Sequence, residues 1–322
     1  MPQPIVLLYE PIHEEGMKVL RQMAQPRLAS GTDLDAVLSQ VRDAEGIIIR
    51  ALGRVGPEVM DAAPRLKVVG RHGVGVDNVD IDAATERGIW VVNTPDAVTQ
   101  PVAEHVVGMM IALIRRFRES DRAVRAGDWF FREQLSGFEL PGKTLGVVGM
   151  GRIGYRTAQI CRLGFGMEIV YCDVVPSPRA EMELSARRLD LIPLLEASDV
   201  VTLHTPYLPE THYLINRETI RHMRSTAFLI NASRGKVVEQ AALVRALEEG
   251  WIAGAGLDVF EEEPVPADNP LLKFDNVLLT PHAATSTKEA LIGMSLVAKD
   301  VVAVLQGHEP RHYVNRPPHP RR

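Results

Sequence analysis

Three side chains that could bind an acidic substrate or exchange a proton with it follow late apolar runs of the chain. Arg234, Glu263 and His282 each come a few residues after such a run, and ligands of an open α/β sheet bind outside the carboxyl ends of its strands. Arginine holds a carboxylate with a fixed fork of donors, and histidine exchanges protons near neutral pH. A carboxylate paired with the histidine orients it and raises its pKa. Together the three residue types fit hydride exchange between a 2-hydroxy acid and a 2-keto acid.

Each of these residues also has a plain structural explanation. Arg234 could form a salt bridge beside a helix, Glu263 lies in an acidic run, and His282 could cap a turn. The chemical hypothesis therefore depends on all three following strands of one nucleotide-binding block.

A glycine-rich segment between a predicted strand and a predicted helix indicates such a block. Residues 145–154 read LGVVGMGRIG and contain G-x-G-x-x-G. Gly149 permits a tight turn, Gly151 lets backbone N–H groups approach a pyrophosphate, and Gly154 lets the helix pack close to the strand. Asp173 ends the next predicted strand, 173 − 154 = 19 positions after the last glycine. A carboxylate there accepts hydrogen bonds from ribose hydroxyls and repels a 2′-phosphate, which favours NAD over NADP. The alternative is a glycine-rich turn with a surface aspartate.

An earlier glycine cluster does not fit the dinucleotide pattern. Residues 70–78 read GRHGVGVDN, so Asn78 stands where a third glycine would be, and no helical pattern starts there. The cluster is more typical of a loop that presents backbone amides to a carboxylate, with a plain tight turn as the alternative. His72 lies inside this loop. His204, before Thr205 at a strand end, is interpreted as structural.

Short apolar runs alternate with amphipathic helical patterns through the chain. Runs without polar alternation are typical of parallel strands covered on both faces. The predicted strands are residues 5–9, 46–49, 66–69, 90–92, 144–148, 168–172, 200–203, 227–231, 254–259 and 277–279. The predicted helices include residues 13–23, 34–43, 102–117 and 287–306, and the proline-rich tail after Gly307 is predicted to be disordered. This alternation favours an α/β protein built from doubly wound parallel sheets.

Composition and charge exclude several classes of protein. The chain has 322 residues, with 36 Lys and Arg against 41 Asp and Glu, so its formal charge is −5. A pI near 6.1 argues against broad attraction to nucleic acid or anionic lipid. The longest apolar run, 106–114, is shorter than the roughly 20 residues of a membrane span, and the start has no basic signal-peptide region. Cys161 and Cys172 give neither a disulfide framework nor a metal-ligand spacing. We expect a cytoplasmic protein with no metal and no nucleic-acid or membrane partner.

The chain strongly resembles the D-isomer-specific 2-hydroxyacid dehydrogenases. The matching segments occur in the family's order, at residues 70–80, 93–95, 102–105, 140–154, 231–235, 256–264 and 279–282. The resemblance implies a Rossmann NAD-binding domain inserted into a flavodoxin-like substrate domain, with catalysis in the cleft. The expected division is 1–98 for the first part of the substrate domain and 99–285 for the NAD-binding domain. Residues 286–322 would then be a C-terminal helix returning to the substrate domain and a disordered tail.

The resemblance also implies roles for single residues. Arg234 would bind the substrate's carboxylate and carbonyl, His282 would be the acid/base paired with Glu263, and the amides of Val74 and Gly75 would hold the carboxylate. The residues implied for NAD are Gly149, Gly151, Arg152, Ile153, Gly154, Asp173, Thr205, Ala232 and Asp258, the last near the nicotinamide amide. Family members are usually dimers joined through the cofactor domain, and the stretch 118–140, with aromatic residues 129–131, would be part of that interface.

Within the family, the opening of the 70–80 segment is most similar to 3-phosphoglycerate dehydrogenases. Arg50 and Arg71 match arginines that hold the substrate phosphate there, whereas residues 51–53 and His72 depart from the pattern. Hydroxypyruvate and glyoxylate reductases share most of the same motifs and are the alternative. A remote alternative is an NAD(H)-sensing binding protein, because the corepressors called C-terminal-binding proteins share this fold and keep the Arg–Glu–His triad.

Overall fold

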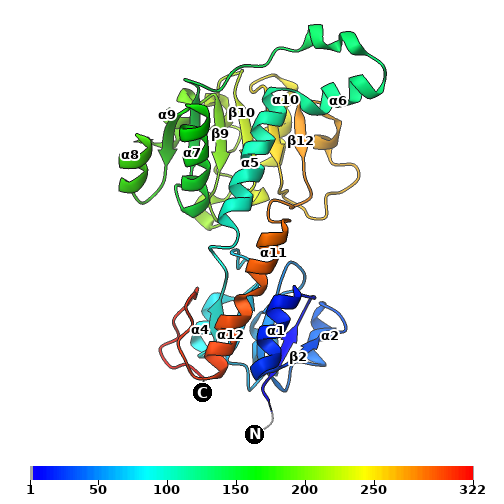
Figure 1. Cartoon of the computed structure of the whole chain (residues 1–322), viewed down its shortest axis with the longest axis vertical. Coiled ribbons are helices and arrows are strands. Elements are labelled where there is room, and N and C mark those ends of the chain that lie inside the picture. Colours follow the sequence, from blue (N-terminus) through cyan, green and yellow to red (C-terminus); the bar gives the residue numbers. More distant parts are fainter. Residues whose placement is uncertain (1–2, 322) are drawn as a thin grey trace. The chain divides into compact units, whose positions relative to one another are not determined.

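The computed structural model describes residues 3–321, and the chain folds as two compact units (Figure 1). Unit 1 comprises the chain up to Val98 together with the part from Thr285 onward. Unit 2 is the continuous stretch Thr99–Ala284. One unit is therefore assembled from both ends of the chain, and the other is inserted between them.

Unit 1 contains one five-stranded sheet in which every strand pair is parallel. Its strands are β1 (Ile5–Leu8), β2 (Gln25–Leu28), β3 (Ala44–Ile49), β4 (Val68–Arg71) and β5 (Trp90–Val92). Their spatial order is β2-β1-β3-β4-β5, which is the flavodoxin-like order. The fold class expected for the substrate domain is confirmed.

Helices cover both faces of this sheet, as its uninterrupted apolar strands require. They are α1 (Glu14–Met23), α2 (Leu34–Leu38), α3 (Pro57–Ala62), α4 (Ile81–Glu86), α11 (Lys288–Ser295) and α12 (Val297–Leu305). One core layer joins the strands to α1 and α12, and the other joins them to α2, α3 and α4. All six residues of β3 are buried between these layers.

Unit 2 contains a seven-stranded sheet, again with parallel pairs throughout. Its strands are β6 (Thr144–Val148), β7 (Glu168–Cys172), β8 (Arg187–Arg188), β9 (Val200–Leu203), β10 (Phe228–Asn231), β11 (Gly254–Leu257) and β12 (Val277–Leu279). The spatial order is β12-β11-β10-β9-β6-β7-β8. Counted from its own first strand, this sheet has the order 3-2-1-4-5-6 of a Rossmann fold with one further strand, as expected.

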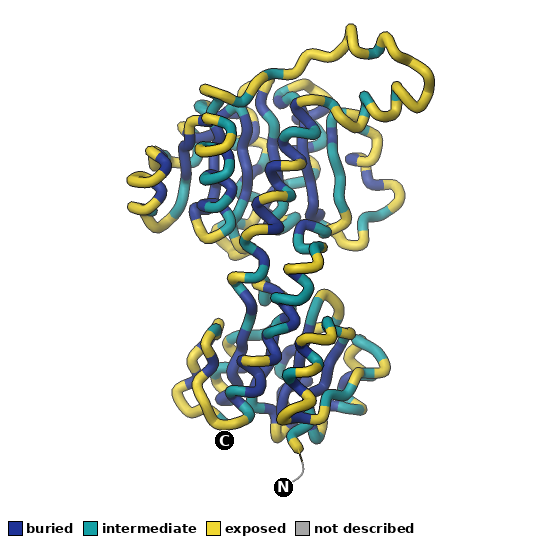
Figure 2. The backbone as a smooth tube through the Cα atoms, viewed as in Figure 1, coloured by how far each residue is buried: buried dark blue, intermediate teal, exposed yellow. Residues whose placement is uncertain are grey.

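The helices of unit 2 flank this sheet, and one segment leaves it. The α-helices are α5 (Thr99–Ile114), α6 (Phe117–Arg125), α7 (Arg152–Phe165), α8 (Pro178–Leu184), α9 (Leu191–Ala197) and α10 (Gln240–Glu248). The 3-10 helices are η1 (Trp129–Gln134), η2 (Pro209–Thr211), η3 (Ile220–His222), η4 (Gly235–Val237) and η5 (Pro270–Lys273). Neither α6 nor η1 contains a buried residue, and Figure 2 shows this arm of the chain as exposed. No helix within residues 3–321 combines the length and the apolar character needed to cross a membrane.

Two short strands, β2 and β8, were not predicted. Both lie at an edge of their sheet. β2 carries Pro26, which cannot donate to a neighbouring strand, and β8 consists of two exposed arginines. An edge strand has only one partner and needs no continuous apolar run, so the pattern used for the central strands does not detect it.

The expectation for the C-terminal region is wrong in two respects. The last helix is two helices, α11 and α12, that meet at Leu296. The tail is not disordered: Asn315 is buried, its Oδ1 accepts from the Val91 amide at 2.7 Å, and its Nδ2 donates to the Ile89 carbonyl at 3.0 Å. The amide of Val314 also donates to the Val91 carbonyl. Specific side-chain pairing of this kind holds the segment despite its proline-rich composition.

Candidate active site

The glycine loop joins β6 to α7 and has the geometry of an anion cradle. Gly149 has φ +94°, and a Cβ there would lie 2.8 Å from the His204 carbonyl. Gly151 caps α7 without any side-chain hydrogen bond, and a Cβ on it would meet open space. A Cβ on Gly154 would lie 2.0 Å from the Gly149 carbonyl oxygen, so the helix packs directly on the loop. The first amides of α7 are thus exposed to any anion placed there.

Asp173 lies directly after β7 and is hydrogen-bonded to this loop. Its Oδ2 accepts from the Met150 amide at 2.7 Å and its Oδ1 from the Val175 amide at 3.1 Å. The carboxylate therefore fixes the glycine loop. The sequence analysis predicted a ribose-binding role for Asp173 and did not predict this contact with the loop.

The remaining residues implied for the cofactor lie along the carboxyl edge of the same sheet. Arg152 and Ile153 form the first turn of α7, and Ala232 follows β10. Thr205 follows β9, and its Oγ1 is buried without a hydrogen-bond partner within residues 3–321. His204 beside it bonds Thr202 at 3.0 Å, and burial lowers its pKa to about 4, so it is neutral and structural. The buried Thr205 hydroxyl, without a partner among the described residues, and the open space at Gly151 lie at one edge of the sheet, and both fit a bound dinucleotide.

The turn after β10 presents Arg234. Asn231 is buried; its Oδ1 accepts from the amide and hydroxyl of Ser233, and its Nδ2 donates to the Arg234 carbonyl at 2.9 Å. A Cβ on Gly235 would lie 1.8 Å from the Phe260 carbonyl oxygen. The turn that carries the arginine thus packs tightly on the segment that leads to Glu263.

His282 and Glu263 form a hydrogen-bonded pair in unit 2. Their Nδ1 and Oε2 atoms are 2.8 Å apart, and Glu263 Oε1 also accepts from the Phe260 amide at 2.9 Å. Hydrogen bonding to Glu263 raises the pKa of His282, against the opposing effects of burial and of Arg234. Burial raises the pKa of Glu263, but its hydrogen bonds outweigh this and the net pKa is lowered. The pair is therefore poised as imidazolium and carboxylate, with Arg234 near enough to affect it.

Asp258 holds the segment that carries His282. The side chain is fully buried. Its oxygens accept from the Ala283 amide at 2.8 Å and the Ala284 amide at 3.0 Å, and its carbonyl accepts from the His282 amide at 2.8 Å. Burial raises the pKa of Asp258, but hydrogen bonds from His105, Thr280 and these amides lower it overall. This anchoring role was missed because no local sequence pattern links position 258 to positions 282–284.

Unit 1 contains a separate group of basic residues at the carboxyl ends of two neighbouring strands. Arg50 follows β3 and Arg71 ends β4, where Ile49 is its register partner. Arg50 Nη1 donates to the Pro11 carbonyl at 2.5 Å, and Arg71 donates to the His72 carbonyl. Burial, followed by the charge of Arg50, lowers the pKa of His72 to about 3. His72 is therefore neutral beside two arginines.

The loop after Arg71 has free backbone donors. Gly73 has φ +128° and is held to Thr94 by three hydrogen bonds. Its amide donates to Thr94 Oγ1, and its carbonyl accepts from both the amide and the hydroxyl of Thr94. Asn93 donates to the Val74 carbonyl at 3.0 Å. Within residues 3–321, the amides of Val74 and Gly75 donate no hydrogen bond. They are thus available to a carboxylate.

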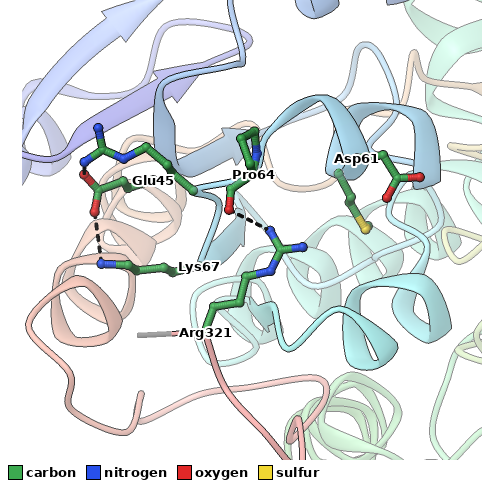
Figure 3. Close-up of a pocket in the computed structure, with 7 residues that line it drawn as sticks. Glu45, Asp61, Pro64, Lys67 and Arg321 are labelled. Atoms are coloured by element: carbon green, nitrogen blue, oxygen red, sulfur yellow. Dashed lines mark hydrogen bonds and ion pairs between the residues drawn. The ribbon is translucent and has the colours of Figure 1, made fainter.

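A hollow of about 660 Å³ at the amino ends of β3 and β4 is a different feature (Figure 3). Its charged groups are already used: Glu45 pairs with Arg65 at 2.5 Å and Lys67 at 3.0 Å, and Arg321 donates to backbone carbonyls. It lies at the opposite end of the strands from Arg50 and Arg71. It therefore has no part in the candidate site.

A glycine loop of the dinucleotide-binding type and a histidine–carboxylate pair lie in unit 2, as in dehydrogenases that use a nicotinamide cofactor. Residues 107–284 match the family model described as D-isomer specific 2-hydroxyacid dehydrogenase, NAD binding domain. Together with its relatives, this match shows that the chain belongs to the D-isomer-specific 2-hydroxyacid dehydrogenases. It is an NAD-dependent oxidoreductase.

Similar proteins are named for two different activities. A glyoxylate reductase of Thermofilum pendens is 44% identical, with 98% of this chain and 96% of that protein covered. A D-3-phosphoglycerate dehydrogenase of Methanocaldococcus jannaschii is 41% identical over 97% of this chain but only 59% of that protein. Among solved structures, the NADPH-dependent glyoxylate/hydroxypyruvate reductase of Sinorhizobium meliloti, in complex with NADP and malonate, is 34% identical with a TM-score of 0.89 and covers 99% of both chains.

Proposed function

We propose that the protein interconverts a small acidic D-2-hydroxy acid and its 2-keto acid, with His282 exchanging the proton on the substrate oxygen. The observation that carries this proposal is the 2.8 Å pair of His282 and Glu263 beside Arg234. Because Nδ1 is held by Glu263, Nε2 is the ring atom that faces the reaction. Bound NADH supplies the hydride to the substrate's C2.

The protein's own groups have distinct tasks in the reduction. Arg234 binds the carboxylate and polarises the carbonyl with its planar fork of donors. The free amides of Val74 and Gly75 hold the carboxylate, and the imidazolium of His282 donates its proton to the oxygen that becomes the hydroxyl. Glu263 stays ionised throughout and stabilises the charged ring. In the oxidation the neutral ring accepts the proton instead.

His282→Ala tests this assignment. We expect kcat to fall by about a hundredfold or more, the usual scale for a general acid/base, with NADH binding retained. Steady-state rates and NADH fluorescence titration separate the two quantities. Near-normal turnover would remove His282 from the mechanism. A matched control is His222→Ala, because His222 pairs with Glu196 on the exposed surface of the same unit.

We propose that the substrate carries a second anionic group, as 3-phosphohydroxypyruvate does. Arg50 and Arg71 stand at the ends of neighbouring strands beside a neutral histidine, so both positive charges can act on one phosphate. The similarity to D-3-phosphoglycerate dehydrogenases over 97% of this chain supports the same substrate class.

The second candidate is reduction of glyoxylate or hydroxypyruvate. The guanidinium groups of Arg50 and Arg71 already donate to backbone carbonyls. In addition, the 44% identical glyoxylate reductase matches over nearly its whole length. NADH oxidation with 3-phosphohydroxypyruvate, hydroxypyruvate, glyoxylate and pyruvate side by side separates the candidates. If the phosphate site exists, Arg50→Gln raises the KM for the phosphorylated substrate about tenfold and leaves that for glyoxylate unchanged. A preference for glyoxylate that Arg50→Gln does not alter would favour the second candidate.

We further propose a cytoplasmic homodimer joined through unit 2. The arm that contains α6 and η1 exposes large apolar side chains, with Trp129 64% and Phe130 66% accessible. Exposed aromatic pairs of this kind mark interaction surfaces, and both cysteines are free thiols, as in a reducing compartment. Light scattering of the wild type and of a Trp129→Ser, Phe130→Ser variant tests the dimer. A monomeric wild type would refute it.

A further inference from the structure

A chain of hydrogen bonds runs from α5 to the segment that carries His282. His105 lies in α5, Thr280 follows β12 and Asp258 follows β11. His105 Nε2 is 3.0 Å from Thr280 Oγ1, and Thr280 Oγ1 is 2.6 Å from Asp258 Oδ1. Three separate elements of unit 2 are thereby joined beside the acid/base.

The direction of these hydrogen bonds follows from donor and acceptor counting. Asp258 is ionised, because its pKa lies below the ordinary value, and an ionised carboxylate only accepts. The single hydroxyl proton of Thr280 must therefore point to Asp258. Thr280 Oγ1 can then only accept from His105, which places the ring proton of His105 on Nε2. Each hydrogen bond of this series is therefore donated in the direction of the buried Asp258 carboxylate.

The Asp258 carboxylate helps to hold the backbone of His282 in an unfavourable conformation. His282 has φ +50°, in the left-handed region that residues with a Cβ rarely adopt. Such a conformation persists only where surrounding contacts over-determine it. The contacts are the two bonds from the Ala283 and Ala284 amides to Asp258 and the bond from the His282 amide to the Asp258 carbonyl. Correct aiming of the His282 ring thus depends on the orientation of Asp258.

We propose that His105 is a positioning residue for His282 that acts through Asp258. It reaches this carboxylate by way of Thr280 and also directly, since its Nε2 lies 3.5 Å from Asp258 Oδ1. This inference rests on the proposed role of His282. The side chain of His105 is only 23% exposed, and its donated hydrogen bond locks the Thr280 hydroxyl toward Asp258. Without that bond the hydroxyl can rotate, the carboxylate loses a fixed donor, and the His282 segment is held less firmly. The effect falls on kcat, because the amides and arginines that bind the substrate are untouched.

Paired substitutions test this proposal with the full-length protein. His105→Leu removes the ring donor and Thr280→Val the hydroxyl, and we expect either to lower kcat about tenfold while the KM for the keto acid changes less than about twofold. His105→Gln carries an N–H donor at a similar distance and Thr280→Ser keeps the hydroxyl, so both should recover most of the rate. His222→Leu is the matched control. Unchanged kcat in His105→Leu, or a Gln variant as slow as the Leu variant, would overturn the proposal.

Two further measurements keep the test independent of how well single variants fold. Because both side chains act on the same carboxylate, the double variant His105→Leu, Thr280→Val should lose less than the product of the two single losses, whereas fully multiplied losses would contradict the proposal. In the wild type, nitrogen NMR of His105 should find the proton on Nε2, and a proton on Nδ1 alone would refute the proposed direction of these hydrogen bonds.

If His282→Ala retains turnover, the proposed function fails. If only His282→Ala loses turnover while His105→Leu does not, the positioning role alone fails.

Discussion

The charge on Glu263 should determine the pH range over which His282 works. Reduction of a keto acid needs the imidazolium, and Glu263 raises the pKa of His282, so the protonated form persists to higher pH. Glu263→Gln keeps an oxygen that can accept from Nδ1 but removes the charge. Burial and Arg234 then both lower the pKa of the ring. The alkaline limb of kcat/KM for reduction should move to lower pH, and oxidation, which needs the neutral ring, should become active at lower pH.

The magnitude follows from the geometry of the pair. A hydrogen bond to a charged group contributes about 1.5–3 kcal/mol. The two side chains are 54% and 36% exposed, so solvent screening places the pair at the lower end of that range. About 1.5 kcal/mol corresponds to about tenfold in rate. Keto-acid reduction should therefore fall about tenfold on the alkaline side of the profile and much less on the acid side.

Initial rates of NADH oxidation and of NAD reduction, each between about pH 6 and pH 9, test this prediction across the ordinary titration range of histidine. The control is Glu262→Gln, which removes an exposed charge from the same acidic run. An alkaline limb that does not move in Glu263→Gln, or that moves equally in Glu262→Gln, would refute the argument that this one carboxylate sets the pKa of His282.

Three further predictions concern the cofactor loop and the C-terminal segment. Asp173→Ala should reduce the preference for NADH over NADPH about tenfold, measured as the ratio of kcat/KM values; an unchanged ratio contradicts the ribose assignment. Gly154→Ala should weaken NADH binding about tenfold or more, because its Cβ would lie 2.0 Å from a glycine-loop carbonyl, and fluorescence titration measures this. Asn315→Ala should lower the free energy of unfolding of unit 1 by about 2–3 kcal/mol, since buried groups at Val91 and Ile89 lose their partner. A loss below about 0.5 kcal/mol in urea unfolding would contradict it.

The central architecture could be predicted from the sequence because buried parallel strands leave a direct signal. Strands such as β3 and β9 are covered on both faces and consist almost entirely of apolar residues. The polar positions that follow β10, β11 and β12 could be placed at one edge for the same reason. Edge strands and the tail carry no such signal. Their structure depends on single partners, such as the two hydrogen bonds that Asn315 forms with backbone far away in the sequence.

Within the site, the sequence indicated which residues take part but not how they are held. The type and place of His282, Glu263 and Asp173 follow from chemistry and spacing. That Asp173 also fixes the Met150 amide, and that Asp258 turns inward to the 283–284 amides, depends on side-chain directions. Hydrogen bonds between residues far apart in sequence are set by packing, so no local pattern could predict them.

The split of unit 1 between the two ends of the chain has a consequence for the order of folding during synthesis. Val297, Val301 and Val304 of α12 complete a core layer with Val6, Ile48 and Val68, which are made almost three hundred to just over two hundred residues earlier. The first five strands therefore leave the ribosome with one face of their sheet covered by α1 alone, and the part that α12 covers still open. Unit 2 is continuous in sequence and can form its own core before α12 has been synthesised. A released chain truncated after residue 284 would contain all of unit 2 and a partly open apolar sheet in unit 1, which is the kind of surface that chaperones bind.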